Sequence, residues 1–294
     1  MSVKHPIIAI TGASGAGTST ARGIFEGIFR REGIHAAIIE GDSFHRYERE
    51  ELRRVNDARE AAGKPFISPF GLEANCFDQL EALFRAYSET GTGQYRRYLH
   101  DEAEAAARGQ AAGTFTPWQA LPEPTDLLFY EGLHGALKTA EVDVARYPDL
   151  LIGIAPVINL EWIQKIHRDT RMRGYARETV AAAILARMDD YVHYIVPQFE
   201  LTQINFQRVP LVDTSNPIIA RTIPAASESL VVIRFADPRG VDFPYLLTMI
   251  PHAFMSRANT LVIPGDRQDL AMQLILTPLI WQLMAKKENA ASGE

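Results

Sequence analysis

The segment Gly12–Thr20 has the composition of a loop that binds phosphate groups. It follows a short apolar run and leads into a helix-like periodic stretch, the context in which backbone N–H groups point at phosphates. The spacing of Gly12, Gly17 and Ser19 fits the Walker A pattern, whose serine coordinates Mg²⁺, but Thr18 stands where that pattern has lysine. The alternative is an ordinary strand-to-helix turn rich in small residues. We predict an ATP-binding loop formed by Gly12, Ala13, Ser14, Gly15, Ala16, Gly17, Thr18, Ser19 and Thr20.

A cation elsewhere in the chain should compensate for the missing lysine, because phosphoryl transfer depends on positioning and on offsetting negative charge. Lys165, Arg168 and Asp169 are spaced so that they lie near one face of a helix. They could converge on one ligand and act in catalysis. The alternative is a solvated helix face on which Glu161, Lys165 and Asp169 form weak salt bridges.

Two carboxylates follow predicted strands directly, at the edge where parallel sheets bind ligands. Asp42 comes just after the strand Ala36–Glu40, and Glu131 ends the strand Leu127–Tyr130. Asp42 could accept the proton of a substrate hydroxyl that attacks the γ-phosphorus, as an aspartate does in other kinases. Glu131 resembles the acid that binds Mg²⁺ in such enzymes, with Ser19 and Asp42 as further candidate ligands. The alternative for Asp42 is a turn residue that caps the next helix.

Strand and helix patterns alternate along the chain, which predicts an α/β fold of the P-loop NTPase type, similar to nucleotide monophosphate kinases. We expect a mostly parallel sheet flanked by helices and a single domain, residues 1–294, with a frayed tail at 288–294. Gly109–Asp126 is rich in loop residues and is predicted to be an insertion. The strand candidates are Ile7–Thr11, Ala36–Glu40, Leu127–Tyr130, Leu150–Ala155, Val209–Val212, Leu230–Phe235 and Thr260–Ile263. After the first helix, which ends near Arg31, the helix candidates are Glu73–Tyr87, Leu160–Arg173, Glu178–Val192 and Asp266–Ala285, the last interrupted by Pro278.

Composition excludes several classes of function. Apolar residues make up 47% and charged residues 22%, which is ordinary for a globular protein, and the net charge of −6 argues against nucleic acid as a partner. No apolar run reaches the roughly 18 residues of a membrane span, and no export signal is indicated, so we expect a cytoplasmic enzyme with no membrane partner. Cys76 is the only cysteine, so an intrachain disulfide cannot form.

Several segments together resemble the phosphoribulokinase family. The similarity begins with the glycine loop, Glu40–His45, Tyr130–Gly135 and Val157–Asp169, and it covers nearly the whole chain. It continues through Phe206–Pro210, Asp213–Pro217 and Met255–Asn259. The short length, the single cysteine and the threonine in the phosphate loop resemble the bacterial form, which implies a homo-octamer.

The resemblance implies transfer of the ATP γ-phosphate to O1 of D-ribulose 5-phosphate in the Calvin cycle. In the family, the aspartate matching Asp42 is the catalytic base and the glutamate matching Glu131 is a Mg²⁺ ligand. The residues matching Lys165 and Arg168 contact the transferring phosphate or the substrate. All four residue types are present here.

The family also has substrate-site residues at the positions of His45, Arg49, Asp169 and Arg173. Basic groups suit this site because ribulose 5-phosphate carries a dianionic phosphate, for which Arg49 and Arg173 are the best clamps. The alternative is that each is a solvated arginine near a helix end.

Regulation is implied by the same resemblance. Bacterial members are activated by NADH and inhibited by AMP, and the arginines matching Arg31, Arg234 and Arg257 are associated with subunit interfaces or with the response to effectors. The chain has no Gly-x-Gly-x-x-Gly dinucleotide loop, so an NADH site would have to be built from arginines between subunits.

Two other functions remain open from the residues. A uridine or pantothenate kinase would share the glycine loop and Asp42, but a nucleoside site should offer aromatic stacking, whereas Arg49, Lys165, Arg168 and Arg173 suit a phosphate. A nucleotide-binding switch would need no acceptor, but the chain has no Asn-Lys-x-Asp motif for reading guanine.

Overall fold

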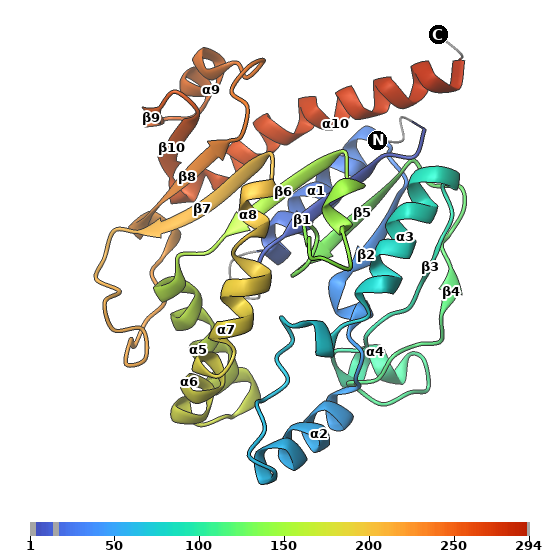
Figure 1. The fold of residues 1–294 in the computed structure, drawn as a ribbon. Coiled ribbons are helices and arrows are strands. Elements are labelled where there is room, and N and C mark those ends of the chain that lie inside the picture. Colours follow the sequence, from blue (N-terminus) through green and yellow to red (C-terminus); the bar gives the residue numbers. More distant parts are fainter. Residues whose placement is uncertain (1–3, 14–17, 293–294) are drawn as a thin grey trace.

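The computed structural model of the chain describes residues 4–13 and 18–292, apart from the side chains of Ser19, Met172, Arg173, Ala291 and Ser292. The predicted phosphate-loop residues Ser14, Gly15, Ala16 and Gly17 therefore lie outside the described residues. Within those limits the chain forms one main sheet with helices on both faces (Figure 1).

The main sheet has eight strands in the order β2-β5-β1-β6-β7-β8-β10-β9. The pairs from β2 to β7 are parallel, and the three pairs from β7 to β9 are antiparallel. This arrangement confirms the predicted α/β class. The strands are β1 Ile7–Thr11, β2 Ala36–Glu40, β5 Leu127–Gly132, β6 Leu150–Ala155, β7 Ile204–Pro210, β8 Ser229–Phe235, β9 Phe254–Arg257 and β10 Thr260–Pro264.

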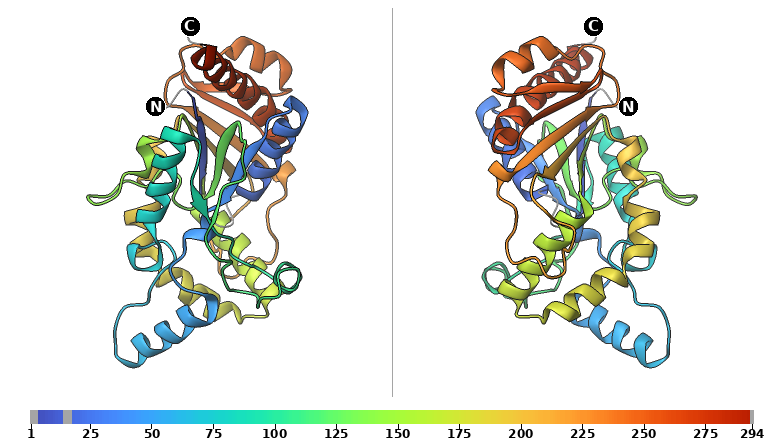
Figure 2. Two further views of the ribbon diagram at one scale, coloured as in Figure 1. Left: turned by 90° about the vertical axis from the view of Figure 1, so that its right-hand side faces the viewer. Right: turned by 90° about the vertical axis from the view of Figure 1, so that its left-hand side faces the viewer.

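Successive side chains of β1 point to opposite faces of the sheet, and both sets are apolar, which explains why helices cover both faces. Ile8 and Ile10 pack with α1 (Thr18–Glu32) and α10 (Gln268–Ser292), whereas Ile7 and Ala9 pack with α3 (Phe77–Thr90) on the other face. All four side chains are fully buried, as expected for a strand inside a parallel sheet. Figure 2 shows the sheet edge-on, with α1 and α3 on opposite sides. β1 is thereby a rigid support for the loop that follows it.

The elements beyond the carboxyl ends of the parallel strands come from distant parts of the sequence. They are α2 (Arg49–Ala61), α5 (Ile158–Arg173) and α6 (Arg177–Leu185), which lie below the sheet in Figure 1. A segment of residues 94–120, which we call the arm, contributes the short pair β3 (Gln94–Tyr95) and β4 (Gln119–Ala120) with α4 (Glu102–Ala106) between them. The predicted insertion at Gly109–Asp126 thus covers only the second half of the arm.

Several predicted boundaries are wrong. The strand expected at Val209–Val212 overlaps only the last two residues of β7, which spans Ile204–Pro210, and α3 begins at Phe77 instead of Glu73. The helix expected at Glu178–Val192 divides into α6, α7 (Met188–Asp190) and a π-helical turn at Tyr191–Ile195. Helices α2, α8 (Gln198–Leu201) and α9 (Phe243–Met249) were not predicted. In α2, charged residues outnumber apolar ones, so its sequence gives little helical periodicity.

The C-terminal helix differs most from expectation. Pro278 lies inside α10 and does not interrupt it, and Asp266, where the helix was predicted to begin, belongs to a preceding 3-10 turn. Burial of Leu276 and Ile280 against the sheet compensates for the hydrogen bond that proline removes. The segment from residue 288, predicted to be a frayed tail, continues α10 as far as Ser292. Just before it, Nζ of Lys287 donates to the carbonyl oxygen and the carboxylate of Asp126 at 3.0 Å each. Within the described residues, no helix is long and apolar enough to cross a membrane.

Candidate active site

The two ends of the predicted phosphate loop have the geometry that such a loop needs. Gly12 directly follows β1 and donates its backbone N–H to Gly132 at 3.1 Å, and Thr18 begins α1. A Cβ atom at Gly12 would lie 2.8 Å from the carbonyl oxygen of Ile154, so only glycine fits there. Thr20 lies in the first turn of α1, whereas the side chain of Ser19 lies outside the description. The strand-loop-helix context is therefore confirmed at both ends.

Asp42 and His45 form a hydrogen-bonded pair just beyond β2. Asp42 lies in the 3-10 turn Gly41–Phe44, and its Oδ1 is 3.2 Å from Nε2 of His45, whose Nδ1 is 2.9 Å from Oδ1 of Asn75. Although the surrounding atoms oppose the charge, the hydrogen bond from His45 holds the pKa of Asp42 at about 2. Burial opposes the charge of His45 as well, but its bond to Asp42 raises the pKa of that ring. Asp42 is thus a fully ionised carboxylate at neutral pH.

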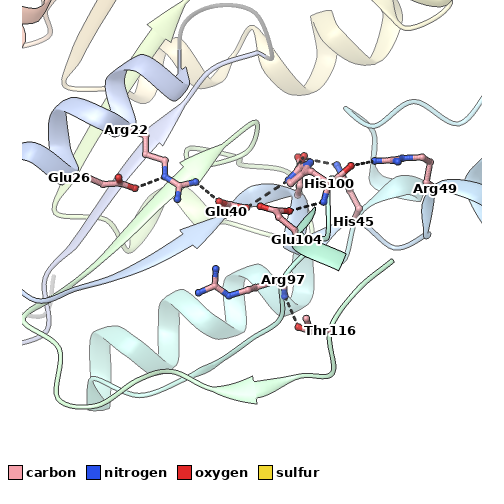
Figure 3. Close-up of polar contacts among 10 residues, drawn as sticks. Arg22, Glu26, Glu40, His45, Arg49, Arg97, His100, Glu104 and Thr116 are labelled. Atoms are coloured by element: carbon pink, nitrogen blue, oxygen red, sulfur yellow. Dashed lines mark hydrogen bonds and ion pairs between the residues drawn. The ribbon is translucent and has the colours of Figure 1, made fainter. Parts of the chain in front are cut away.

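A second carboxylate links this pair to the helix after the phosphate loop. Glu40 pairs with Arg22 of α1, and its Oε2 lies 3.8 Å from Nε2 of His100, which is also 3.8 Å from Oδ2 of Asp42. Arg22 also binds Glu26 at 2.7 Å (Figure 3). The hydrogen bond with His100 lowers the pKa of Glu40 to about 2; burial opposes this shift, and Arg22 adds to it. Glu40 in turn raises the pKa of His100. Basic groups therefore lie on both sides of the Asp42 region.

A cleft of about 500 Å³ opens over Asp42. Arg49, at the start of α2, lines it as an exposed side chain, donates to the carbonyl of His100 at 2.8 Å and lies 5.9 Å from the centre of the Tyr98 ring. Cation and aromatic groups from separate elements thus meet in one concave space. The lining residues are Asp42, His45, Tyr47, Arg49, Leu52, Pro69, Ala74, Tyr98, His100, Tyr175 and Arg187.

The basic face of α5 is directed inward. Nζ of Lys165 lies 2.8 Å from Oδ2 of Asp169, and Nε of Arg168 lies 3.0 Å from Oδ1 of the same residue. The side chains of Lys165 and Asp169 are only 17% and 6% exposed, and Glu161 is buried, so the solvated-face alternative is wrong. Burial lowers the pKa of Lys165, although the hydrogen bond with Asp169 opposes that shift. Burial would raise the pKa of Asp169, but the hydrogen bond with Lys165 lowers it. Lys165 and Arg168 do not line the cleft over Asp42, and the side chain of Arg173 lies outside the description.

Glu131 lies beside Glu40, but its surroundings disfavour the ionised form of its carboxyl group. The two residues are register partners on β5 and β2. Burial, with Asp42 and Glu40 nearby, raises the pKa of Glu131, and a hydrogen bond with Thr18 and the charge of Arg22 oppose this only in part. A bound cation would relieve that cost, which fits a metal ligand. Within the described part of the chain, no cluster of three His, Cys, Asp or Glu residues could hold a metal alone. Phosphate oxygens would have to complete such a site.

The three arginines expected at effector or interface sites do not meet in one place. Arg234 and Arg257 line a cavity of about 420 Å³ beside β8 and β9. Arg31 lies on α1, where it donates to Thr277 of α10 at 3.1 Å and pairs with Glu32 at 2.8 Å. Arg31 therefore contacts α10 and not the cavity.

Sequence reasoning missed Tyr98, His100, Asn75 and the ion pairs of Glu40. Tyr98 and His100 belong to the arm, which is far from Asp42 in the sequence and close to it only in the folded chain, so no local spacing pointed to them. Asn75 is buried and fixes His45, with its own amide held by the carbonyls of Pro69 and Gly71 at 2.9 and 2.8 Å. Glu40 did carry a signal, since it precedes Asp42 at the end of a predicted strand.

Comparison with known proteins agrees with this geometry. The model of the "Phosphoribulokinase / Uridine kinase family" matches residues 7–215, which include the phosphate loop, both strand-end carboxylates and α5. The chain belongs to the phosphoribulokinase/uridine kinase family. This membership accounts for the order of elements from β1 to β7 around the site.

Relatives within the family are similar over almost their full length. The chromosomal phosphoribulokinase of Cupriavidus necator is 60% identical over 99% of this chain and 100% of the relative. A phosphoribulokinase of Nitrobacter vulgaris is 61% identical over 98% of this chain and 99% of the relative. The solved phosphoribulokinase from Rhodobacter spheroides superposes with a TM-score of 0.90 at 56% identity, covering 98% of this chain and 100% of that one. All three of these relatives are phosphoribulokinases.

Proposed function

We infer that the chain is an ATP-dependent kinase with phosphoribulokinase activity, which transfers the γ-phosphoryl group of ATP to O1 of D-ribulose 5-phosphate. The product is D-ribulose 1,5-bisphosphate, the CO₂ acceptor of the Calvin cycle. The observation that carries this proposal is the cleft in which an ionised Asp42 is surrounded by His45, His100 and Arg49. Such a cleft suits an anionic sugar phosphate whose hydroxyl must lose a proton. The relatives of about 60% identity support the choice of acceptor.

Asp42 is the proposed catalytic base. Its carboxylate is ionised at neutral pH and 42% exposed, so it is open to a substrate hydroxyl from the cleft. A base of low pKa acts by accepting the proton as the oxygen bonds to phosphorus, when that proton becomes acidic. His45 and His100 then stabilise the carboxylate and keep it directed toward the cleft.

Basic side chains bind the substrate's own phosphate. Arg49 lines the cleft at the start of α2, and His45, which pairs with the base, lines the same cleft. Arg173, at the end of α5, completes the proposed phosphate clamp. Guanidinium groups suit this task because they bind phosphate oxygens through two parallel hydrogen bonds.

Lys165, Arg168 and Asp169 act on the ATP side. The Lys165 ammonium replaces the cation that Thr18 does not supply, and Arg168 adds a second positive charge. Asp169 holds both side chains, so they are oriented before the γ-phosphoryl group moves. The phosphate loop, residues 12–20, binds the phosphates through its backbone N–H groups.

Ser19 and Glu131 are the proposed ligands of Mg²⁺, with Asp42 as a further candidate. The buried Glu131 carboxyl, whose pKa is raised, is the group that fits a cation best. The ion would offset the charge of the ATP phosphates when bound. Asp42 already has His45 and His100 as partners, which favours the base role over metal binding.

We further propose that the chain forms one domain over residues 1–294 and assembles as a homo-octamer activated by NADH and inhibited by AMP. The cavity beside β9 supports an anionic effector, because Arg234 and Arg257 line it and none of its described lining residues is acidic. Arg31 contacts α10, so its effect on regulation would pass through that helix.

A coupled ADP-release assay with ATP and Mg²⁺ tests the function. Ribulose 5-phosphate, uridine, pantothenate and no acceptor are compared, each with and without NADH. Turnover only with ribulose 5-phosphate is expected, raised by NADH and lowered by AMP. Turnover with uridine or pantothenate would keep the kinase chemistry and reject the acceptor, and equal ADP release without any acceptor would reject both.

A further inference from the structure

The segment that carries Asp42 and His45 is held by the arm as well as by β2. We call residues 41–46 the catalytic segment. It leaves the sheet at the end of β2 and reaches α2 at Arg49, so most of it lies outside the sheet's hydrogen-bond ladder. A segment of this kind needs contacts from elsewhere to fix its side chains to within a few tenths of an ångström.

Arg96 supplies such contacts from the arm. Its Nε donates to the carbonyl oxygen of Ser43 at 2.9 Å, and its Nη2 donates to the carbonyl oxygen of His45 at 2.6 Å. Ser43 directly follows Asp42, so the two bonds hold the backbone just after Asp42 and at His45 itself. A planar guanidinium presents two donors in a fixed fork, which a lysine ammonium cannot reproduce.

Aromatic rings hold the Arg96 guanidinium in place. Its central carbon lies 3.7 Å from the centre of the Phe115 ring and 4.8 Å from that of Trp118, both on the returning half of the arm. Trp118 in turn contacts Phe44 of the catalytic segment, with ring centres 5.8 Å apart. Phe44 is 1% exposed, so this contact connects the arm to the core below the site.

The arm also binds the chain just after the catalytic segment. The backbone N–H of Arg49 donates to the carbonyl of Gly113 at 2.9 Å. Gly113 has a φ of 85°, and a Cβ there would lie 2.7 Å from Cβ of Arg49, so glycine allows this approach. The arm therefore contacts both ends of the chain that carries Asp42, His45 and Arg49.

We propose that Arg96 is a positioning residue for the acceptor half of the site: it fixes the backbone of the catalytic segment so that Asp42 and His45 face the cleft. This inference rests on the proposed function, in which the cleft binds the phosphate acceptor. Arg96 does not line the cleft, so it acts through the backbone and not by contact with substrate. The ATP side, built on β1, α1 and α5, has no contact with Arg96 among its described bonds.

The test compares Arg96→Met, Arg96→Lys and the matched control Arg97→Met. Arg97 is the neighbouring arginine, exposed and directed away from the catalytic segment, with its guanidinium 5.8 Å from the Tyr95 ring (Figure 3). For each protein, kcat and KM are measured for both substrates, together with the melting temperature and its shift on adding ATP.

Arg96→Met should lower kcat/KM for ribulose 5-phosphate by about 10²-fold, the cost of a displacement near 1 Å at a catalytic group. Its KM for ATP and its stabilisation by ATP should stay within about twofold, because only the acceptor side moves. Arg96→Lys keeps a charge and one donor and should recover about tenfold of the loss. Arg97→Met should behave like the wild type.

Two results would overturn the proposal: a folded Arg96→Met with kcat/KM within about threefold of wild type, or a loss that falls equally on ATP and acceptor along with the melting temperature. If Arg96→Met does not fold, Arg96→Lys decides alone, since unchanged acceptor kinetics in that variant would contradict a positioning role. Failure of the proposed function is seen separately, because the wild type would then prefer another acceptor. The same variants would be compared with that acceptor.

Discussion

The neighbouring strands β2 and β5 both end in carboxylates, but the two ends differ in their electrostatic environment. At the end of β2, Glu40 and Asp42 pair with Arg22, His45 and His100, and the pKa of each carboxyl is held at about 2. At the end of β5, burial raises the pKa of Glu131, which has no ion pair among the described residues. The end of β2 therefore stabilises negative charge, whereas at the end of β5 the charge of Arg22 offsets the cost of burial only in part.

This difference separates two tasks that the sequence alone assigned to similar residues. A carboxylate with cationic partners stays ionised and is ready to accept a proton from a substrate. A buried carboxyl with a raised pKa gains most from a cation that arrives with the nucleotide. The comparison thus favours Asp42 as the base and Glu131 as the metal ligand.

Asp42→Asn should have the largest effect. The amide cannot accept a proton from O1, so kcat should fall by about 10²–10⁴-fold while the KM for ATP changes little. The measurement is steady-state kinetics on protein whose fold is checked by circular dichroism. Asp189→Asn is the control, because that side chain is 90% exposed. Near-wild-type turnover of a folded Asp42→Asn would exclude Asp42 as the base.

Lys165→Met tests the cation on the opposite side of the site. Loss of a preorganised charge should lower kcat by about 10²–10³-fold, with a smaller effect on stability because Arg168 still pairs with Asp169. Kinetics and the melting temperature are compared with those of Lys138→Met, an exposed lysine with a carboxylate partner of its own. Similar losses of turnover and stability in Lys165→Met would indicate a purely structural salt bridge.

Glu131→Gln should weaken the dependence on metal. We expect the Mg²⁺ concentration for half-maximal rate to rise by about tenfold or more, while Asp42→Asn leaves it unchanged. The folded state without metal should be more stable than wild type at neutral pH, because the raised pKa means that ionised Glu131 opposes folding. Magnesium titrations and thermal melts check both statements. A Mg²⁺ requirement altered in Asp42→Asn but not in Glu131→Gln would reverse the two assignments.

Glu161 extends the comparison to a third carboxyl, with the smallest expected effect. Burial raises its pKa to about 7, although Tyr191 donates to it at 3.0 Å and Lys165 lies nearby. The folded protein therefore holds the proton between pH 4.5 and about 7, and stability is lost as pH rises through this window. Glu161→Gln cannot ionise, so its stability relative to wild type should increase across that window by at most about 3 kcal/mol.

Urea unfolding of both proteins at pH 5 and pH 8 measures this difference. Glu178→Gln, an exposed glutamate near the start of α6, provides the control, for which the difference should not depend on pH. A Glu161→Gln difference that is the same at both pH values would contradict the raised pKa of the buried carboxyl.

Local patterns predicted the sheet and the sheet-end residues well. β1, β2 and β6 have the predicted bounds, because short, largely apolar runs bounded by polar residues, glycine or proline identify buried parallel strands. Lys165, Arg168 and Asp169 do converge, since helix spacing alone brings them together. The roles of these residues remain predictions.

The acceptor side was less predictable because it is assembled from distant segments. The arm brings His100 to Asp42 through contacts such as those of Arg96, and its two-residue strands give no recognisable pattern. Asn75 reaches His45 from the turn before α3, a contact that depends on how that turn packs. Burial also could not be read from spacing on α5, which left a solvated face open as an alternative although Glu161 and Asp169 are buried.

The most direct test of the account identifies the atom that receives the phosphoryl group. Wild-type protein is incubated with ATP, Mg²⁺ and ribulose 5-phosphate, and the product is analysed by ³¹P NMR. A new phosphomonoester signal at C1 beside the original signal at C5, formed with one ADP per product, is the predicted result. Phosphorylation at another oxygen, or ADP release with no new sugar phosphate, would contradict the claim that Asp42 activates O1 of ribulose 5-phosphate.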